Sequence, residues 1–296
     1  MSGAIVLVAC LLGGYALRAR VDPAALTIYL MNLALPALAV SALHDAPAPS
    51  VAAVASVWAV FVAAAAIFVP LGRHLGWDRP TTGCVVLCAG LSNTSFVGFP
   101  LLEVLRGPDA VAAAVPLDQL GSFLLVCTLA PAVVAWASGR VWSARDAAVR
   151  IGAFPAFWAM VVAFVVPGDA WPTAVLEACD RLAQTLSPVA LFAVGARLRL
   201  PEPGAAGPFW SGLGFKLVFA PLLALGWMGA LDPDAGPALR DVVVLEAAMP
   251  PMVTGALLAQ AAGLRAELAA AFLGVGVPVS LLTVPVWAAL LRHVSG

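Results

Sequence analysis

The sequence predicts an all-α integral membrane protein with about ten transmembrane helices. Hydrophobic residues make up 62% of the chain and charged residues only 10%, whereas a soluble domain carries about 25% charged residues. Apolar runs recur along the whole chain, and most approach the ~20 residues that cross a ~30 Å hydrocarbon core. The breaks between these runs are short and hold most of the charge, so we expect no soluble domain within them.

Each expected span is an apolar run that ends where charge, glycine or proline accumulates. The clearest breaks lie at 18–23, 72–80, 138–146 and 197–203. Ten-residue segments of alternating polarity, the pattern of transmembrane β-strands, do not occur. In chain order the expected spans are 3–17, 24–43, 50–72, 80–106, 110–137, 151–167, 172–196, 208–231, 237–263 and 267–291.

The distribution of arginine predicts the orientation, because cytoplasmic loops carry an excess of Arg and Lys. If both termini lie outside the cytoplasm, most loop arginines fall on the cytoplasmic side. That side holds Arg18, Arg20, Arg73, Arg79, Arg140, Arg145, Arg150, Arg197, Arg199 and Arg265, and the outer side holds Arg106, Arg240 and Arg292, with Arg181 if its segment begins there. We therefore expect a multi-pass protein of the inner (plasma) membrane with both termini outside.

The two halves of the chain resemble each other. The segment around Pro36 in the second span matches the one around Pro188 in the seventh, and the fifth and tenth spans share a similar run ending at Pro131 and Pro285. Because five is odd, five helices followed by five similar ones would have opposite orientations, as in secondary transporters. We expect a first repeat at 1–137, a cytoplasmic linker at 138–150 and a second repeat at 151–296.

The middle of the fourth span carries the first polar constellation, at residues 89–100. Four small polar residues precede Gly98 and Pro100, and a proline removes an amide donor and clashes with the carbonyl four residues earlier. Backbone groups freed in hydrocarbon need partners from protein or a watery cavity. The run therefore indicates a broken helix that lines a cavity; the alternative is a simple kink. The four polar residues are Ser92, Asn93, Thr94 and Ser95.

The middle of the ninth span carries the second constellation, at residues 246–255. Pro250 and Pro251 together remove two amide donors and bias Met249 towards extended geometry. Two broken helices at corresponding positions of two halves are the best pointer in a sequence to a transporter binding site. Half-helix N-termini carry partial positive charge and free N–H groups, which suit a carboxylate.

With these motifs in order, the chain resembles the auxin efflux carrier family of bacteria and plants. The matching segments cover essentially the whole chain: N-L-A-L-P-A-L at 32–38, S-N-T-S-F-V-G-F-P-L-L at 92–102, S-P-V-A-L-F-A-V-G-A-R-L at 187–198, K-L-V-F-A-P-L at 216–222 and A-A-M-P-P-M-V-T-G at 247–255.

The resemblance implies ten helices in a five-plus-five inverted repeat, with helices 4 and 9 crossing. It implies a scaffold of helices 1, 2, 6 and 7, a transport domain of helices 3–5 and 8–10, carriage of small organic anions, and a homodimer through the scaffold. Thr94 or Ser95 stands where plant carriers have Asn after a proline, so we expect the first crossover to be less sharply broken. The expected substrate-binding residues are Asn93, Thr94, Ser95, Gly98, Pro250, Pro251, Thr254, Asn32 and Ser187.

Ionisable residues at membrane depth are candidates for coupling or gating. Glu246 lies one turn before Pro250 and is the first candidate; the alternative is a structural carboxylate that is paired or tilted outward. Asp118 and Gln119 lie about two turns into the fifth span. Lys216 either attracts an anion or extends its side chain to the cytoplasmic interface.

The sequence favours a secondary carrier of small organic anions, such as malate, malonate or auxin-like acids, working by alternating access. A sodium-coupled symporter of the bile acid family type is the alternative, but Glu246 is the only acid evident near the crossover. No catalytic pair, soluble output domain, nucleotide-binding motif or basic stripe indicates an enzyme, a sensor, a pump or a nucleic-acid partner. We expect the anion and the lipid bilayer as partners, and no cofactor or metal.

Overall fold

The computed structural model describes residues 2–46, 49–139, 141, 143–197 and 206–294, and within them the chain forms helices and no strand. The all-α prediction is thus confirmed for these residues. The helices are α1 (Ser2–Ala16), α2 (Pro23–Tyr29), α3 (Leu35–Leu43), α4 (Val51–His74), α5 (Arg79–Gly90), α6 (Phe99–Arg106), α7 (Pro108–Pro116), α8 (Leu124–Cys127), α9 (Leu129–Ser138), α10 (Ala144–Gly152), α11 (Pro155–Val165), α12 (Thr173–Ala183), α13 (Leu186–Arg197), α14 (Ala206–Gly214), α15 (Ala220–Leu231), α16 (Pro237–Ala248), α17 (Val253–Ala261) and α18 (Ala266–Val294).

Short π-helical turns join several of these helices into longer rods. They are η1 (Leu30–Ala34), η2 (Thr94–Gly98), η3 (Leu117–Phe123) and η5 (Phe215–Phe219), while η4 (Gly168–Ala170) is a 3₁₀ turn. The stretches that are long and apolar enough to cross a membrane, among the residues described, are Pro23–Leu43, Val51–His74, Pro108–Ser138, Ala206–Leu231 and Ala266–His293. Their bounds lie within a few residues of the corresponding expected spans.

Side-chain caps set where several helices begin. Asp22, Ser50, Asp78 and Ser143 each accept a hydrogen bond from a backbone amide in the first turn of α2, α4, α5 and α10, respectively. Such caps satisfy one of the amide groups that a helix N-terminus leaves without a partner. Polar residues that interrupt the apolar runs thus also start the helices.

The fourth and ninth spans are both broken in the middle. Residues 91–93 separate α5 from η2, and residues 249–252 separate α16 from α17. At the first break, Leu91 has φ −102° and ψ 128°, and Asn93 also leaves helical geometry. Pro100 does not make this break. It lies in the first turn of α6, and the π-turn η2 before it takes up the altered backbone spacing.

The seventh expected span is divided as well. A turn at Gln184 and Thr185 separates α12 from α13, which the sequence analysis did not predict. The ring of Pro188 clashes with the carbonyl of Gln184 in a continuous helix. In its place, Thr185 Oγ1 donates to the Leu182 carbonyl and pairs with the Tyr29 hydroxyl at 2.6 Å. A single side chain thereby closes α12 and fixes it to α2.

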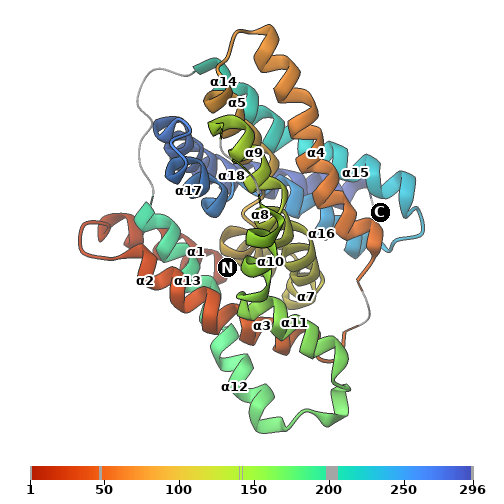
Figure 1. Ribbon diagram of the computed structural model, residues 1–296. Coiled ribbons are helices and arrows are strands. Elements are labelled where there is room, and N and C mark those ends of the chain that lie inside the picture. The colour runs from red at the N-terminus through yellow and green to blue at the C-terminus, as the bar shows by residue number, and fades with distance from the viewer. Residues whose placement is uncertain (1, 47–48, 140, 142, 198–205, 295–296) are drawn as a thin grey trace.

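Two glycines bring α1 and α13 into close backbone contact. A Cβ atom placed on Gly14 would lie 2.1 Å from the Phe192 carbonyl oxygen, and one on Gly195 would lie 2.1 Å from the Leu11 carbonyl oxygen. Small residues allow this approach between membrane helices, where van der Waals packing replaces the hydrophobic effect as the driving force. In Figure 1, α1, α2 and α13 lie together on one side of the molecule.

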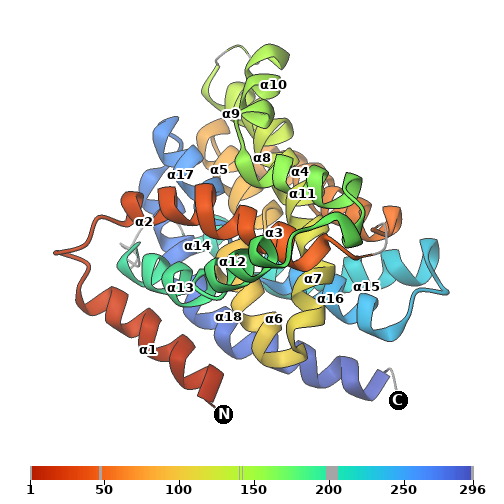
Figure 2. The same ribbon diagram turned by 90° about the horizontal axis from the view of Figure 1, so that it is seen from below.

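Other contacts hold the remaining helices. α3, which continues α2, packs against α11 and α12, whereas α4 packs against α5 and α15, and α16 packs against α15 and α18. Figure 2 shows both chain ends along the lower edge, with α10 at the upper edge. Arg140 and Arg199, two of the arginines expected on the cytoplasmic side, lie outside the described residues.

Candidate functional site

The two helix breaks lie against each other and pair through their backbones. The Asn93 amide donates to the Pro250 carbonyl at 2.9 Å, the Met252 amide donates to the Leu91 carbonyl at 3.1 Å, and Ser92 forms an antiparallel bridge with Pro251. Neither proline has an N–H to satisfy. The crossing thereby gives hydrogen-bond partners to backbone groups that would otherwise be unsatisfied in the hydrocarbon core of the membrane.

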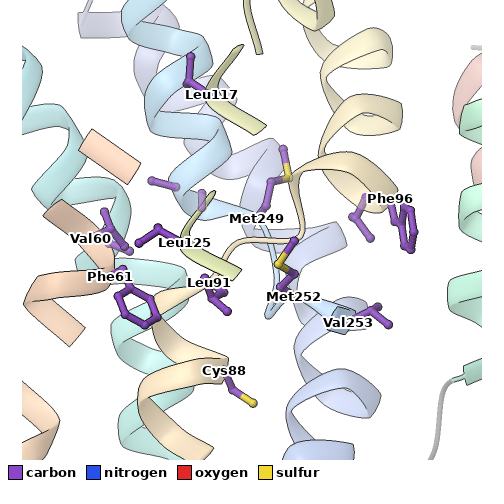
Figure 3. Close-up of a cluster of buried hydrophobic side chains, with 14 of the residues drawn as sticks. Val60, Phe61, Cys88, Leu91, Phe96, Leu117, Leu125, Met249, Met252 and Val253 are labelled. Atoms are coloured by element: carbon purple, nitrogen blue, oxygen red, sulfur yellow. The ribbon is translucent and has the colours of Figure 1, made fainter. Parts of the chain in front are cut away.

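Apolar side chains surround this backbone pairing. Leu91 and Met249 are 1% and 0% exposed. In Figure 3 they and Met252 project from the two non-helical stretches, with Phe61 and Val60 of α4 nearby. The polar groups at the crossing are therefore shielded from lipid by the protein itself.

Asp118 joins the crossing from the fifth span. Its carboxylate accepts hydrogen bonds from the hydroxyl of Thr94, from Ser95 Oγ at 2.6 Å and from Gln119 Nε2 at 2.7 Å. The π-turn η3 carries Asp118 and Gln119, both fully or almost fully buried. The sequence-based statement that Glu246 is the only nearby acid was thus wrong, since the fold adds Asp118.

Lys216 lies inside the crossing. Its ammonium group donates to Ser92 Oγ and to the Ala247 carbonyl at 3.0 Å, and the residue is 0% exposed. The alternative in which this side chain extends to the cytoplasmic interface is therefore wrong. Because Ser92 belongs to the first break and Ala247 to the end of α16, one ammonium group connects both broken helices.

Glu246 is buried without a hydrogen-bonding partner. It is 2% exposed, and neither carboxylate oxygen has a partner among the described residues. A Cβ atom added to Gly98 would lie 2.8 Å from Glu246 Oε1, so only glycine leaves room for this carboxylate. Glu246 interacts electrostatically with Asp118 and Lys216. Glu246 is thus not tilted outward, and its role in coupling or gating stays a prediction.

Asn93 offers an unused donor at the crossing. The residue is 2% exposed, and its side-chain Nδ2 is buried with no hydrogen-bond partner in the described part of the chain. Gly98, Pro250 and Pro251 are buried beside it, and Thr254 is half-buried in the first turn of α17.

Two of the expected substrate-binding residues have contacts outside the crossing. Asn32 is exposed, and its side-chain amide donates to the Ile28 carbonyl of its own helix at 2.8 Å. Ser187 donates to Glu103 at 2.9 Å. The structure thus groups most of the expected residues at the crossing and leaves these two elsewhere.

Ser187 and Glu103 line an open groove of about 440 Å³. The groove lies between α3, α12 and α13 on one side and α6 and α7 on the other. Phe99 is one of its walls, next to the π-turn of the crossing. No Lys, Arg or His is among the described residues that line it, whereas three carboxylates do: Glu103, Asp109 and Asp180.

The described residues form only helices, several of them able to cross a membrane, and two broken helices meet deep inside. These features define a multi-pass membrane protein of transporter type. A family model described as membrane transport protein matches residues 1–142 and 141–288. The chain therefore belongs to this membrane transport family, the auxin efflux carrier family that its motifs resemble.

A curated relative supports the same assignment. The chain is 26% identical over 227 residues to an uncharacterized transporter of Methanothermobacter thermautotrophicus, covering 74% of this chain and 71% of that protein.

Proposed function

We propose that this protein is a secondary carrier of small organic anions, with the anion bound at the helix crossing. The observation that carries the proposal is the unused amide donor of Asn93, buried where two half-helices begin. The helical stretch 94–106 begins directly after Asn93, and α17 begins at Val253. Helix N-termini favour anions through their free N–H groups and their partial positive charge.

The ligand class follows from the donors at the crossing. A carboxylate oxygen that accepts from Asn93 Nδ2 would form a charge-assisted hydrogen bond, worth about 1.5–3 kcal/mol. Malate, malonate and auxin-like acids share this carboxylate. The acids of the open groove attract cations more than anions, so in this proposal the anion's favourable contacts come from the crossing.

Alternating access requires two groups of helices that move relative to each other. We propose that residues 1–137 and 151–296 form two inverted repeats of five helices each. Of the ten expected helices, 1, 2, 6 and 7 would form the scaffold, and 3–5 and 8–10 would form the transport domain. The groove between α3, α12, α13 and α6, α7 lies along this division. The family match is divided at 141–142, inside the linker proposed at 138–150.

In the proposed setting, the protein lies in the inner membrane with both termini outside the cytoplasm and pairs through its scaffold as a homodimer. It needs no catalytic step, because transport is driven by gradients. A membrane-embedded enzyme is disfavoured by the membrane transport family to which the chain belongs.

The test is ligand binding by Asn93→Ala. Purified wild-type protein is screened for binding of radiolabelled malate, malonate and indole-3-acetate, and the best ligand is titrated against the variant. Losing one charge-assisted hydrogen bond should weaken binding about tenfold or more.

Leu282→Ala is the matched control, because Leu282 is 72% exposed on α18. It should bind as the wild type does, and both variants should elute as folded protein. If Asn93→Ala also retains wild-type affinity, the anion does not bind at the crossing. If no carboxylate binds the wild type at millimolar concentration, the proposed substrate class is wrong.

A further inference from the structure

We propose that two ion pairs, one at each end of the crossing, close its four half-helices into a ring that opens at one end and hinges at the other. The pair that opens is Asp78–Arg265, and the pair that stays closed as the hinge is Arg106–Asp241. These four side chains are positioning residues, because they act on the crossing through the helices that carry them. The ring stands on its own geometry; only its use in alternating access rests on the proposed function.

The half-helix α17 runs back along α5, from the break to the start of α5. Next to the break, the Met252 amide donates to the Leu91 carbonyl at 3.1 Å. Farther along, a Cβ atom added to Gly255 would lie 2.8 Å from Leu91 Cδ1. Beyond the end of α17, Arg265 reaches Asp78, the N-cap of α5. The two half-helices therefore lie antiparallel, and the ion pair joins the ends that are farthest from the break.

The other two half-helices, α6 with its π-turn η2 and α16, are arranged in the same way. Near the break, Glu246 of α16 lies against Gly98 of η2. Farther from the break, Arg106 at the end of α6 pairs with Asp241 of α16 at 2.7 Å. The two breaks also pair through their backbones. The chain and these contacts thus form a closed ring through all four half-helices.

Both ion pairs have the same composition and the same place in the two halves of the chain. In each pair, the aspartate lies at or near the start of one broken span, and the arginine lies at or just beyond the end of the other. A glycine with positive φ lies within two residues of each arginine: Gly107 beside Arg106, and Gly263 beside Arg265. This is the relation expected between two repeats of opposite orientation.

The pair at Arg106 is the stronger of the two. The Arg106 and Asp241 side chains are 16% and 11% exposed, and Arg106 Nη2 also donates to the Ala288 carbonyl of α18 at 2.8 Å. The second oxygen of Asp241, Oδ1, is buried and has no hydrogen-bond partner among the described residues. Separating the pair would leave a buried carboxylate without its counter-charge, which is strongly unfavourable. This end of the ring therefore stays closed.

The pair at Arg265 is the weaker one, and it holds a strained backbone. Its two side chains are 53% and 48% exposed, and an exposed ion pair contributes little to stability. Arg265 has φ +42° and is the only non-glycine residue with positive φ in the described part of the chain. This region is unfavourable for a residue with a Cβ atom. The bonds of the guanidinium to Asp78 and to Thr81 Oγ1 offset the strain. Because breaking them also releases the strain, the ring opens here first.

The test measures opening of the ring by hydrogen exchange of the purified protein, with no anion present. Buried amides exchange when their contacts open, so the rate reports the population of the open state. Mass spectrometry follows deuterium uptake in peptides that cover the crossing, 91–98 and 249–256. In the wild type, the buried stretch 81–90 of α5 should exchange faster than the equally buried stretch 241–248 of α16, because the ring opens at the end of α5.

Variants break the ring at one end at a time. Arg106→Gln should raise the exchange rate at the crossing about tenfold, and Arg265→Gln about threefold, because the first pair is buried and the second exposed. Uptake in α12, which belongs to none of the four half-helices, should not change. Arg292→Gln is the matched control, because Arg292 is exposed in the last turn of α18 and has no ion pair among the described residues. It should exchange as the wild type does.

Pairing is tested by combining variants. Because each partner acts only through the other, adding Asp241→Asn to Arg106→Gln should raise the exchange rate by less than about twofold more. If Arg106→Gln fails to fold, Arg106→Lys replaces it. Lysine keeps the charge but loses the planar fork of the guanidinium, so we expect a smaller rise, about threefold.

Three outcomes would overturn the proposal. Wild-type exchange at the crossing in the folded arginine variants would show that the pairs do not hold the ring. Faster exchange of 241–248 than of 81–90, or a larger effect of Arg265→Gln than of Arg106→Gln, would place the hinge at the other end. An equal rise in α12 would indicate a general loss of stability. Because no anion is present, these results do not depend on whether Asn93 binds a carboxylate, and their failure leaves the anion proposal intact.

Discussion

Lys216 has an unusual position for an ammonium group in a membrane protein, because it is fully buried and holds together two broken helices. It donates to Ser92 Oγ of the first break and to the Ala247 carbonyl at the end of α16. Hydrogen bonds from charged donors contribute about 1.5–3 kcal/mol each. The side chain therefore stabilises the crossing and does not merely compensate charge.

Lys216→Met tests this role, because methionine keeps the length and loses the charge. The variant leaves Ser92 and the Ala247 carbonyl without their donor and leaves two buried carboxylates without the cation. We expect the free energy of unfolding to fall by about 3–5 kcal/mol, as when one partner of a buried ion pair is removed. Thermal unfolding in detergent measures it, with Leu282→Ala as the control. An unchanged Tm would contradict the proposed role of the lysine.

At the residue scale, the sequence predicted where the two helices break but not which side chains from other helices contact the breaks. The polar run at 92–95 and the two prolines at 250–251 interrupt apolar helices, and this local pattern can be recognised in the sequence alone. The contact of Asp118 with Thr94 joins residues on different helices, and no local pattern indicates it.

Among the elements, α1 and α13 make the closest backbone approach through Gly14 and Gly195. Gly195→Ala would place a Cβ 2.1 Å from the Leu11 carbonyl oxygen, which is backbone and has no rotamer to change. The two helices would have to separate along the contact. We expect a cost of about 1–3 kcal/mol, typical of overpacking.

Gly214→Ala is the matched control for this glycine prediction. Gly214 is helical, and a Cβ there meets no atom within 4 Å. Alanine should be neutral or stabilising at that position, since glycine is the poorer helix former by roughly 0.5–1 kcal/mol. Tm values of the two variants, measured side by side in detergent, decide the matter. Equal losses of Tm would show that the Gly195 contact is looser than described.

The start of α5 offers a pH-dependent test at the scale of one helix. Asp78 caps α5 by accepting from the Thr81 amide at 2.8 Å, and it forms an ion pair with Arg265 at 2.8 Å. The hydrogen bond from Thr81 and, to a smaller extent, the charge of Arg265 lower the pKa of the Asp78 carboxyl. This group lies in the loop between α4 and α5 and is half-exposed.

Because the pKa of Asp78 is lower in the folded than in the unfolded state, its ionised form stabilises the fold at pH values above the unfolded-state pKa of about 3.9. This contribution is lost as the pH falls through the lower folded-state pKa. Because the pair is exposed, we expect at most about 1 kcal/mol. Asp78→Asn keeps the cap but loses the charge. Its Tm should lie slightly below the wild type at pH 7, and the difference should shrink as the pH falls below about 3.9. A difference in Tm that does not depend on pH would contradict this account.

The breaks in the helices show how far sequence can predict elements. The five stretches able to cross a membrane were predicted to within a few residues of their ends, because charge, glycine or proline gathers where each apolar run ends. The division of 172–196 was missed, because α12 and α13 both carry hydrophobic residues and the turn depends on Thr185 reaching Tyr29 from another part of the chain. The first break, at 91–93, lies within the predicted run 89–100 but before Pro100, because a π-turn can absorb a proline that would otherwise end the helix.

For the whole molecule, orientation decides which side of the membrane each proposed site faces. Both chain ends lie along the same edge in Figure 2, and α10 of the linker lies at the opposite edge. The excess of arginine in the loops on the α10 side predicts that this side is cytoplasmic.

Reporter fusions test this orientation directly. Alkaline phosphatase fused after Gly296 should be active, because it folds only outside the cytoplasm, and green fluorescent protein fused there should be dark. The same reporters inserted after Gly139, at the start of the linker, should give the opposite pattern. The two positions control for each other, because an inverted topology would exchange the results at both. The reporters can differ between the two positions only if an odd number of spans separates them. Phosphatase activity at both positions would contradict the five-helix halves. Fluorescence at Gly296 would mean that the chain lies in the membrane with the opposite orientation.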